Sequence, residues 1–518
     1  MNNIPNLCIG DVSPNGQVSI LDEDRLSYSV LNNSKGAVGI RTISKSLLNE
    51  FIGYIIEHPD NTPTEVRNEL CGRTKIDKFE YGYASTLCIM AQMAISKRNA
   101  YITDKSNENQ NRLSPDDISY ISAIKTKPFV ILGGFSGTGK SQKVKELAFA
   151  TCPNNSHLRT SETTPGNYLL LSVKPNWHDA TEITGFRSSV NRNYYVTDFM
   201  RFLIKAMHFP NVPFFVCLDE MNLAPVEEYF ADFLSVIESR KKTSSGQIVT
   251  DAIIPASVFN EEYNDNFCIF DCLGFERMDR GMTDDGLHET LLGKFIRIDL
   301  INKIKRDGLT IPSNVIIFGT VNMDDTTNSF SRKVIDRAMT FETVVGKFGD
   351  EYFNSDVALN YVKNPLKGEL FLSDEVRATQ MIDEGRFILT KEEQTKILNF
   401  INDINEDLDG SPFKISYRIL NETILLYRSK KRIAEIMKDE DGLADGVEFK
   451  TDLNTIFDDI LMQKVLPRIE GDYEKCSKCL NKLSSRADNN EWQKSYDKIE
   501  FMIKRFGSDR SGFTSFWN

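Results

Sequence analysis

The sequence lacks the features of a secreted or membrane-spanning chain. Its first eight residues, MNNIPNLC, contain neither the basic segment nor the apolar core of a signal peptide. The longest weakly polar stretch, Tyr81–Ile95, is too short and too polar to cross a bilayer. Internal repeats and low-complexity tracts are missing as well. We therefore expect a cytoplasmic protein without a membrane partner.

Cysteine and basic charge are also limited. The chain has nine cysteines, an odd number that fits reduced thiols better than a disulfide framework. Cys476 and Cys479 form a C-x-x-C pair in a helical, charged context, so we do not expect a zinc site from them and the pair Cys268/Cys272. The net charge of −12 argues against a protein that coats DNA, and any nucleic-acid contact would need a local basic patch.

What the chain does contain is a phosphate-binding loop. Residues 134–141 read GFSGTGKS, which is the pattern G-x-x-x-x-G-K-S, between the apolar run Pro128–Leu132 and an expected helix over Lys140–Ala150. Glycines let the backbone form a nest of N–H groups that point at phosphates. Lys140 adds charge at the β- and γ-phosphates, and the Ser141 hydroxyl can bind Mg²⁺. The predicted nucleotide-binding residues are Gly134, Ser136, Gly137, Thr138, Gly139, Lys140 and Ser141.

Apolar runs alternate with helix-like segments after this loop, which predicts an α/β fold with a parallel sheet covered on both faces. The expected strands are Pro128–Leu132, Tyr168–Val173, Pro213–Leu218, Asn314–Thr320 and Ala338–Glu342.

The chain divides into three parts on this basis. The polar stretch Thr103–Asp117 reads as a linker. We expect a mainly helical N-terminal recognition or interaction module (1–122), a nucleotide-binding core (123–345) and a helical lid with the C-terminal segment (346–518). The helices expected in the first part are near Ser44–Glu57, Thr64–Leu70 and Ala84–Lys97, and those in the third are Glu392–Asp407, Tyr417–Met437, Phe449–Ile469 and Trp492–Phe506.

Two acids end the third expected strand. Because the carboxyl ends of parallel strands share one edge of the sheet, Asp219 would face the phosphate loop and hold Mg²⁺ through water. Glu220 is placed to polarise the attacking water. The alternative is that both acids simply open the following helix, where negative charge is favourable.

Polar residues further along complete the candidate site. Asn322 ends a buried strand and can orient water or contact the γ-phosphate, or it can merely cap a turn. Arg332 and Arg337 are candidates for an arginine finger that acts on a neighbouring subunit's nucleotide, against the alternative of surface ion pairs. Arg418, at a helix start, would reach the phosphates from the lid unless it is solvated.

The order of these parts resembles that of AAA+ nucleotidases, and several strings resemble the McrB type. LDEMNLAPVEEYF (218–230) is similar to the family's second nucleotide motif, and Gly319–Ala338 is similar to the segment that follows it. The resemblance covers about Lys127 to the C-terminus. The other strings that carry it are Val173–Asp179, Thr184–Phe186, Gln463–Ile469 and Gly512–Trp517.

The resemblance implies further roles. In the McrB signature an Asn followed three positions later by an Asp acts in hydrolysis, and Asn322 and Asp325 match it. The chain departs from the family at Met339-Thr340, where further arginines would stand. The implied protein is a ring, expected to be a hexamer, that hydrolyses GTP or ATP with Mg²⁺. It would drive an McrC-like nuclease subunit in a restriction or anti-phage system, with DNA bound through the N-terminal module or the partner. A MoxR-like remodelling ATPase and a nucleotide-gated sensor with little turnover stay open as alternatives.

Overall fold

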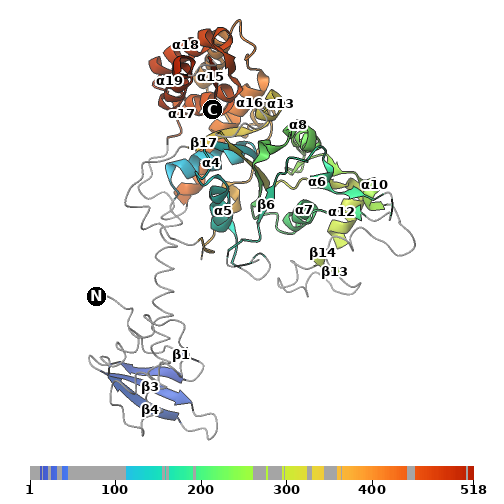
Figure 1. Cartoon of the computed structure of the whole chain (residues 1–518). Coiled ribbons are helices and arrows are strands. Elements are labelled where there is room, and N and C mark those ends of the chain that lie inside the picture. The colour runs from blue at the N-terminus through green and yellow to red at the C-terminus, as the bar shows by residue number, and fades with distance from the viewer. Residues whose placement is uncertain are drawn as a thin grey trace. The chain divides into compact units, whose positions relative to one another are not determined.

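The computed structural model divides into two compact units, Met1–Gln110 and Asn111–Asn518 (Figure 1). Within the residues that the structure describes, no helix is long and apolar enough to cross a bilayer. The described residues are 12–13, 16–21, 25–31 and 38–44 in the first unit, and 113–154, 158, 161, 163–188, 190, 194–260, 276–277, 295–296, 298–323, 330–343, 359–362, 364–439, 450–508 and 512–517 in the second.

The described part of the first unit is a four-stranded antiparallel sheet in the order β1-β2-β3-β4. The expectation of a mainly helical module missed this sheet, and Ser44 ends a strand instead of starting a helix. The other expected helical positions up to Lys97 lie outside the described residues. The strands are β1 (Val12–Ser13), β2 (Gly16–Leu21), β3 (Arg25–Leu31) and β4 (Val38–Ser44).

A five-stranded parallel sheet forms the centre of the second unit. All five apolar runs that the sequence predicted as strands are strands of this sheet, which confirms the α/β class with a parallel sheet. The strands are β5 (Phe129–Gly134), β6 (Tyr168–Ser172), β9 (Phe214–Asp219), β16 (Val315–Asn322) and β17 (Met339–Thr343).

Strand order places the loop strand inside the sheet. The order is β17-β5-β16-β9-β6, and every neighbouring pair is parallel. In register, Asn322 of β16 and Thr343 of β17 both pair with Gly134 of β5. The carboxyl ends of these three strands therefore meet at one edge, which is where ligands bind in open parallel sheets.

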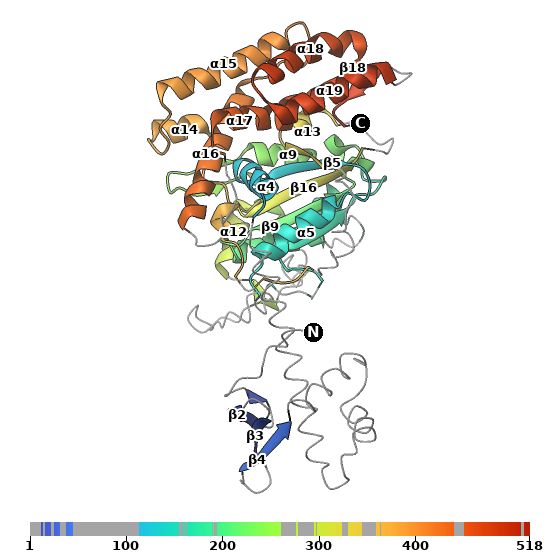
Figure 2. The same ribbon diagram turned by 90° about the vertical axis from the view of Figure 1, so that its left-hand side faces the viewer.

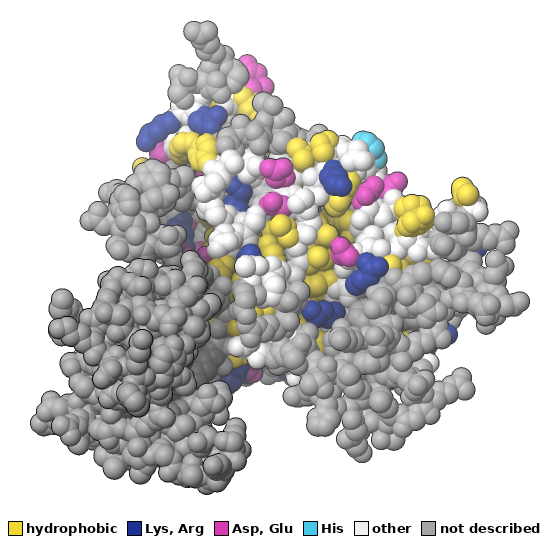
Figure 3. Space-filling view, turned by 60° about the horizontal axis from the view of Figure 1, so that its bottom comes forward, with side chains coloured by type: hydrophobic (Ala, Val, Ile, Leu, Met, Phe, Trp, Pro, Cys, Tyr) yellow, Lys and Arg dark blue, Asp and Glu magenta, His cyan; other side chains and the backbone are white. Residues whose placement is uncertain are grey.

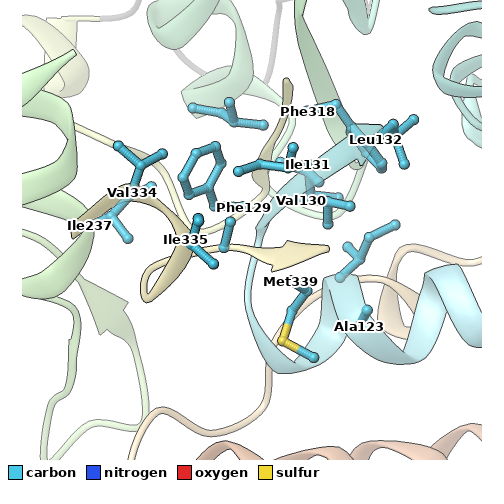
Figure 4. Packing of buried hydrophobic residues seen from close by; sticks show 14 of the residues in the cluster. Ala123, Phe129, Val130, Ile131, Leu132, Ile237, Phe318, Val334, Ile335 and Met339 are labelled. Atoms are coloured by element: carbon cyan, nitrogen blue, oxygen red, sulfur yellow. The ribbon is translucent and has the colours of Figure 1, made fainter. Parts of the chain in front are cut away.

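Helices cover both faces of the sheet, as a parallel sheet requires. The helices α4 (Pro115–Thr126) and α5 (Lys140–Thr151) lie on one face, and α7 (Asp198–His208) lies on the other (Figures 1 and 2). The helix α12 (Ile298–Asp307) packs against α10 (Ala256–Asn260) and β15 (Leu309–Thr310). Figure 4 shows the core beside β5, with Met339 of β17 extending toward the helix that carries Ala123. All six residues of β5 are buried, which explains why its sequence contains no polar side chain.

Short elements connect this framework. The helical ones are α6 (Thr181–Thr184), η2 (Met221–Leu223), α8 (Val226–Tyr229), α9 (Ala231–Glu238), α10 (Ala256–Asn260), α13 (Arg332–Ile335) and η6 (Gly368–Leu370). The strands outside the main sheet are β7 (Phe186–Arg187), β8 (Tyr194–Tyr195), β10 (Lys241–Lys242), β11 (Ile248–Val249), β12 (Ala252–Ile254), β13 (Glu276–Arg277), β14 (Phe295–Ile296) and β15 (Leu309–Thr310).

The last third of the chain is mainly helical. Three predicted helices are present, and α18 is a further one that the sequence analysis did not delimit. The helices are α14 (Ala378–Asp383), α15 (Lys391–Asp407), α16 (Tyr417–Asp439), α17 (Leu453–Ile460), α18 (Tyr473–Asn489) and α19 (Gln493–Ser508).

The helix expected over Phe449–Ile469 is interrupted. It consists of α17, then a π-helical turn η7 (Leu461–Val465) and a 3₁₀ turn η8 (Leu466–Arg468). Pro467 lacks an N–H donor, so it does not continue the α-helical ladder. A short antiparallel pair, β18 (Glu470–Asp472) and β19 (Phe513–Ser515), then ties the C-terminal segment to the end of this interrupted helix.

The end of the polar stretch Thr103–Asp117 is structured. Ser114 caps α4, its hydroxyl accepts from the N–H of Asp117, and the Asp117 carboxylate accepts from the N–H of Ser114. This capping box explains why Asn-, Ser- and Asp-rich sequence can begin a helix. The boundary between the two compact units falls between Gln110 and Asn111, within the polar stretch expected to be a linker.

A buried ionic triad joins the C-terminal helices to the sheet. Glu422 of α16 pairs with Lys127, just before β5, and with Lys464 of η7 at 2.9 Å. Lys464 also donates to the carbonyl oxygens of Asp336 at 3.1 Å and Ala338 at 2.6 Å, beside the start of β17. The two ammonium groups hold the pKa of Glu422 below its usual value, whereas burial lowers the pKa of Lys464 to about 8.

We predict that Glu422→Gln destabilises the fold by about 3–5 kcal/mol, because it leaves two buried cations without a partner. Adding Lys464→Met should recover part of this loss, since it removes one of those cations. Glu435→Gln on the exposed side of α16 serves as the control and should cost less than about 1 kcal/mol. Denaturant unfolding of the variants measures these differences, and equal stability of Glu422→Gln and Glu435→Gln would contradict the account.

Candidate functional site

The loop between β5 and α5 has the backbone of an anion nest. Gly137 and Gly139 have φ of 80° and 78°, in the left-handed region that L side chains rarely adopt. A Cβ at either position would meet nothing within 4 Å, so the need for glycine is conformational and not steric. Gly139 begins α5 without a side-chain cap, which leaves first-turn N–H groups available to a ligand. Ser136 is exposed, so the loop is open to solvent.

Strand β17 supports the loop from one side. A Cβ on Gly134 would lie 2.1 Å from the Thr343 Oγ1, so only glycine fits there. The Thr343 hydroxyl donates to the Gly133 carbonyl oxygen at 3.0 Å and lies 3.0 Å from the Thr138 hydroxyl. Thr343 was not among the predicted site residues, because a hydroxyl inside a strand belongs to no recognisable motif. The register of β17 with β5 is what brings it to the loop.

Lys140 lies inside the loop. Its Nζ donates to the carbonyl oxygens of Gly134 at 2.9 Å and Phe135 at 2.7 Å, and the residue is 7% exposed. Both carbonyls belong to the loop, so the ammonium group is held across the nest. A compact point charge in this position suits a phosphate group.

Asp219 joins three segments at the edge of the sheet. Its Oδ1 accepts from the Ser141 hydroxyl at 2.5 Å and from the Thr320 hydroxyl at 2.8 Å. Thr320 was not predicted, although its position two residues before Asn322 puts both side chains on the same face of β16. The carboxylate and the two hydroxyls are hard oxygen donors, so this group fits Mg²⁺ better than a soft metal.

Glu220 adopts a strained backbone conformation. Its φ of 52° and ψ of 49° lie in the left-handed region, which non-glycine residues visit at a cost. Its N–H donates to the Thr320 hydroxyl at 3.0 Å, and its Oε1 accepts from the Asn322 Nδ2 at 3.2 Å. The carboxylate makes no side-chain cap at η2, so the simple helix-opening alternative does not describe it.

The amide of Asn322 therefore faces the carboxylate of Glu220. The strand ends of β16 and β9 are neighbours, and this places the two side chains together although 102 positions separate them. Asp325, the other residue of the signature, lies outside the described residues. Its role stays a prediction.

The structure places the predicted arginines away from the loop. Arg332 donates to the Pro412 carbonyl oxygen at 2.7 Å, and Arg337 lies 3.5 Å from the Glu238 carboxylate. Arg418 donates to Glu238 at 2.8 Å instead of reaching the phosphate loop from a lid. Arg337 and Arg418 thus form ion pairs with Glu238, whereas Arg332 binds a backbone carbonyl oxygen.

These arginines group near the amino ends of the strands. Asp336, shortly before β17, lies 3.9 Å from Arg418 and 3.4 Å from Arg468. The loop is at the other end of β5, whose six residues span roughly 20 Å. None of the three predicted arginines, Arg332, Arg337 and Arg418, is therefore brought to the loop of its own chain.

The C-terminal segment packs behind the loop strand. A Cβ on Gly133 would lie 3.1 Å from the ring of Trp517, and the Trp517 Nε1 donates to the Pro467 carbonyl oxygen at 3.0 Å. Because β19 pairs with β18, this indole is fixed to the helical part as well as to the sheet. The last residues of the chain thus support the strand that carries the loop.

The cysteine pair of α18 lies in the interior of the helical part. Cys476 and Cys479 are buried, and burial raises the pKa of Cys476 to about 12. Among the residues that the structure describes, no group of three or more His, Cys, Asp or Glu side chains is placed to hold a metal ion. Cys268 and Cys272 lie outside the described residues.

Comparisons with known proteins yield a family model over part of the chain and a distant structural likeness. Residues 372–511, about a quarter of the chain, match a family model described as a domain of unknown function (DUF8727). No curated protein matches the chain. A crystal structure from Cytophaga hutchinsonii, provisionally described as an ATPase, is similar over 70% of this chain and 97% of that chain, at 11% identity and a TM-score of 0.34. A likeness at this TM-score does not establish a shared fold.

We predict that Glu220→Gly is more stable than Glu220→Ala by about 1 kcal/mol. Both variants lose the carboxylate and differ only in the Cβ, which is unfavourable at a φ of 52°. Thermal unfolding measures the difference. The pair Glu228→Gly and Glu228→Ala on α8 serves as the control and should differ in the opposite sense, because glycine weakens a regular helix. A Glu220→Gly protein no more stable than Glu220→Ala would show that the left-handed backbone carries no strain.

Proposed function

We propose that the chain is a Mg²⁺-dependent nucleoside-triphosphate hydrolase. The observation that carries the proposal is the hydrogen bond of 2.5 Å between the loop hydroxyl of Ser141 and the Asp219 carboxylate. It joins a phosphate nest to an acidic strand end, which is the pairing that phosphoryl transfer needs. Bound Mg²⁺ would neutralise charge on the β- and γ-phosphates, and Ser141 and Asp219 would hold it.

The remaining residues have distinct roles in this proposal. Lys140 and the N–H groups of the nest bind the phosphates. Glu220 accepts a proton from the attacking water, and Asn322, whose amide contacts Glu220 at 3.2 Å, orients that carboxylate and the water. Thr320 is a positioning residue, because its hydroxyl bonds both the Asp219 carboxylate and the Glu220 N–H.

We further propose that the protein works as a ring, expected to be a hexamer. Arg332 and Arg337 lie at the opposite edge of the sheet from the loop, so they can meet a nucleotide only on a neighbouring copy. A guanidinium is positively charged and planar, and both properties suit the negative charge that develops on the transferred phosphoryl group. Arg418 belongs to the same edge through its ion pair with Glu238, so any contact it makes with phosphates would also be to a neighbour.

By its resemblance to McrB-type proteins, the ring would be the motor subunit of a restriction or anti-phage system with a separate McrC-like nuclease. On the face drawn in Figure 3, basic and acidic side chains are interspersed among hydrophobic ones. Such mixed charge gives this face little general attraction for DNA. The resemblance implies that DNA is bound through the N-terminal unit or through the nuclease partner, and we adopt this as part of the proposal.

Glu220→Gln should lower steady-state hydrolysis by about 10²–10³-fold and leave nucleotide affinity nearly unchanged, because the amide cannot accept the proton. The assay compares GTP and ATP in parallel, with nucleotide binding measured on the same samples. Glu227→Gln on α8, an exposed acid close in sequence, is the control and should keep wild-type turnover. Unchanged hydrolysis in Glu220→Gln would rule out the assigned role of Glu220. Binding with negligible turnover in the wild type, even with the nuclease, would favour the sensor alternative.

Mixing two inactive variants tests the shared site. Lys140→Ala lacks a working loop but keeps its arginines, whereas Arg337→Ala keeps its loop. If Arg337 acts on the neighbour, a mixture of the two recovers part of the wild-type hydrolysis at the interfaces where an intact loop meets an intact arginine. The same experiment with Arg332→Ala decides between the two candidates. Mixtures that stay as inactive as their components, although mass measurement shows mixed rings, would contradict a site shared between subunits.

A further inference from the structure

A cavity lies far from the phosphate loop. It is a cavity of about 420 Å³ between the end of α9, the start of β5, α14 and the first turns of α16. Cavities of this size commonly hold small molecules. Lys127, which lines it, precedes β5 and so lies at the amino edge of the sheet. The cavity is therefore separate from the candidate hydrolysis site.

Positive charge dominates the lining. Four cationic side chains line the cavity, namely Lys127, Arg240, Arg377 and Arg418, against the two carboxylates Glu238 and Glu422. Lys127 pairs with Glu422, and Arg418 pairs with Glu238. Among the residues that the structure describes, Arg240 and Arg377 have no carboxylate partner, which leaves an excess of two positive charges.

Arg240 is the unusual member of this group. The residue is 9% exposed, and its Nη2 is enclosed without a hydrogen-bond partner. Burial lowers the pKa of Arg240 to about 10, and no carboxylate offsets this effect. A buried guanidinium without a counter-charge is costly, and most buried charges are paired. An anion in the cavity would supply a counter-charge for this guanidinium.

The first turn of α16 adds to the positive electrostatic potential in the cavity. Tyr417, Arg418 and Asn421 of this helix line the cavity, and α16 is 23 residues long. The amino end of a long helix carries partial positive charge from its aligned peptide dipoles. Together with the unpaired Arg240, this end favours a ligand with more than one negative charge.

We propose that this cavity binds a small phosphate-bearing anion, such as pyrophosphate or the phosphate chain of a free nucleotide, at a site independent of the Gly134–Ser141 loop. Arg240 and Arg377 supply the unpaired guanidinium groups, whose planar donors match phosphate oxygens. Lys127 and Arg418 also line the cavity, but their carboxylate partners neutralise their charge.

The test uses the full chain with Lys140→Ala, which disables the loop. Calorimetry with pyrophosphate at constant ionic strength should detect binding to this protein. Adding Arg240→Met should raise the dissociation constant at least about tenfold, because a charge-assisted contact is lost while the aliphatic stem is kept. Without pyrophosphate, Arg240→Met should also raise the melting temperature, since it removes an uncompensated buried charge.

Two further variants keep the outcome interpretable. Lys241→Met alters the exposed neighbour of Arg240 and should leave pyrophosphate affinity unchanged. Arg377→Met, at an exposed position, should fold normally and weaken binding severalfold, which covers the case in which Arg240→Met does not fold. Repeating the titration with GTP and ATP separates a preference for a nucleotide from a preference for phosphate alone. Equal pyrophosphate affinity with and without Arg240 and Arg377, or no binding to the Lys140→Ala protein, would overturn the proposal without affecting the hydrolysis site.

Discussion

The parallel direction of all five central strands is the constraint on which the rest of the second unit depends. It brings the carboxyl ends of β5, β9, β16 and β17 to one edge, so residues from four distant segments meet there. Asp219, Thr320 and Ser141 form their hydrogen bonds only because β16 lies between the loop strand and the acidic strand. The same direction sends the starts of β5 and β17 to the other edge, where the arginines lie. This topology therefore places the phosphate loop with Lys140 at one edge of the sheet and Arg332, Arg337 and Arg418 at the other.

The carboxylates at the two edges of the central sheet have different surroundings. At the loop edge, carboxylates accept hydrogen bonds from hydroxyl and amide groups, and they stay available to a cation. At the opposite edge, Glu422 is buried between two lysines, and this triad connects α16 and η7 to the starts of two strands. Breaking such a triad is costly because the remaining charges stay buried. The helical C-terminal part is therefore fixed to the sheet by ionic as well as apolar contacts, and Trp517 adds a second connection behind the loop.

The sequence predicted the central sheet well because strands buried on both faces are continuous apolar runs, as Phe129–Leu132 and Phe214–Leu218 are. The phosphate loop and the acids were predictable because each has a fixed local pattern. Thr320 and Thr343 were not, since their roles follow from strand register alone. The positions of Arg332, Arg337 and Arg418 depend on which edge each helix meets, and spacing along the chain does not contain that information. The N-terminal sheet was missed although Arg25–Leu31 alternates polar and apolar residues, a short signal beside longer helical patterns.

The central claim is that the Gly134–Ser141 loop binds a nucleoside triphosphate. The most direct measurement is equilibrium binding of GTP and of ATP, with Mg²⁺, to the wild-type chain and to Lys140→Ala. The account predicts saturable binding of at least one of the two nucleotides by the wild type and a loss of at least about tenfold in affinity in the variant, since a charge-assisted contact to the phosphates is removed. Failure of the wild type to bind either nucleotide, or equal binding by Lys140→Ala, would contradict it.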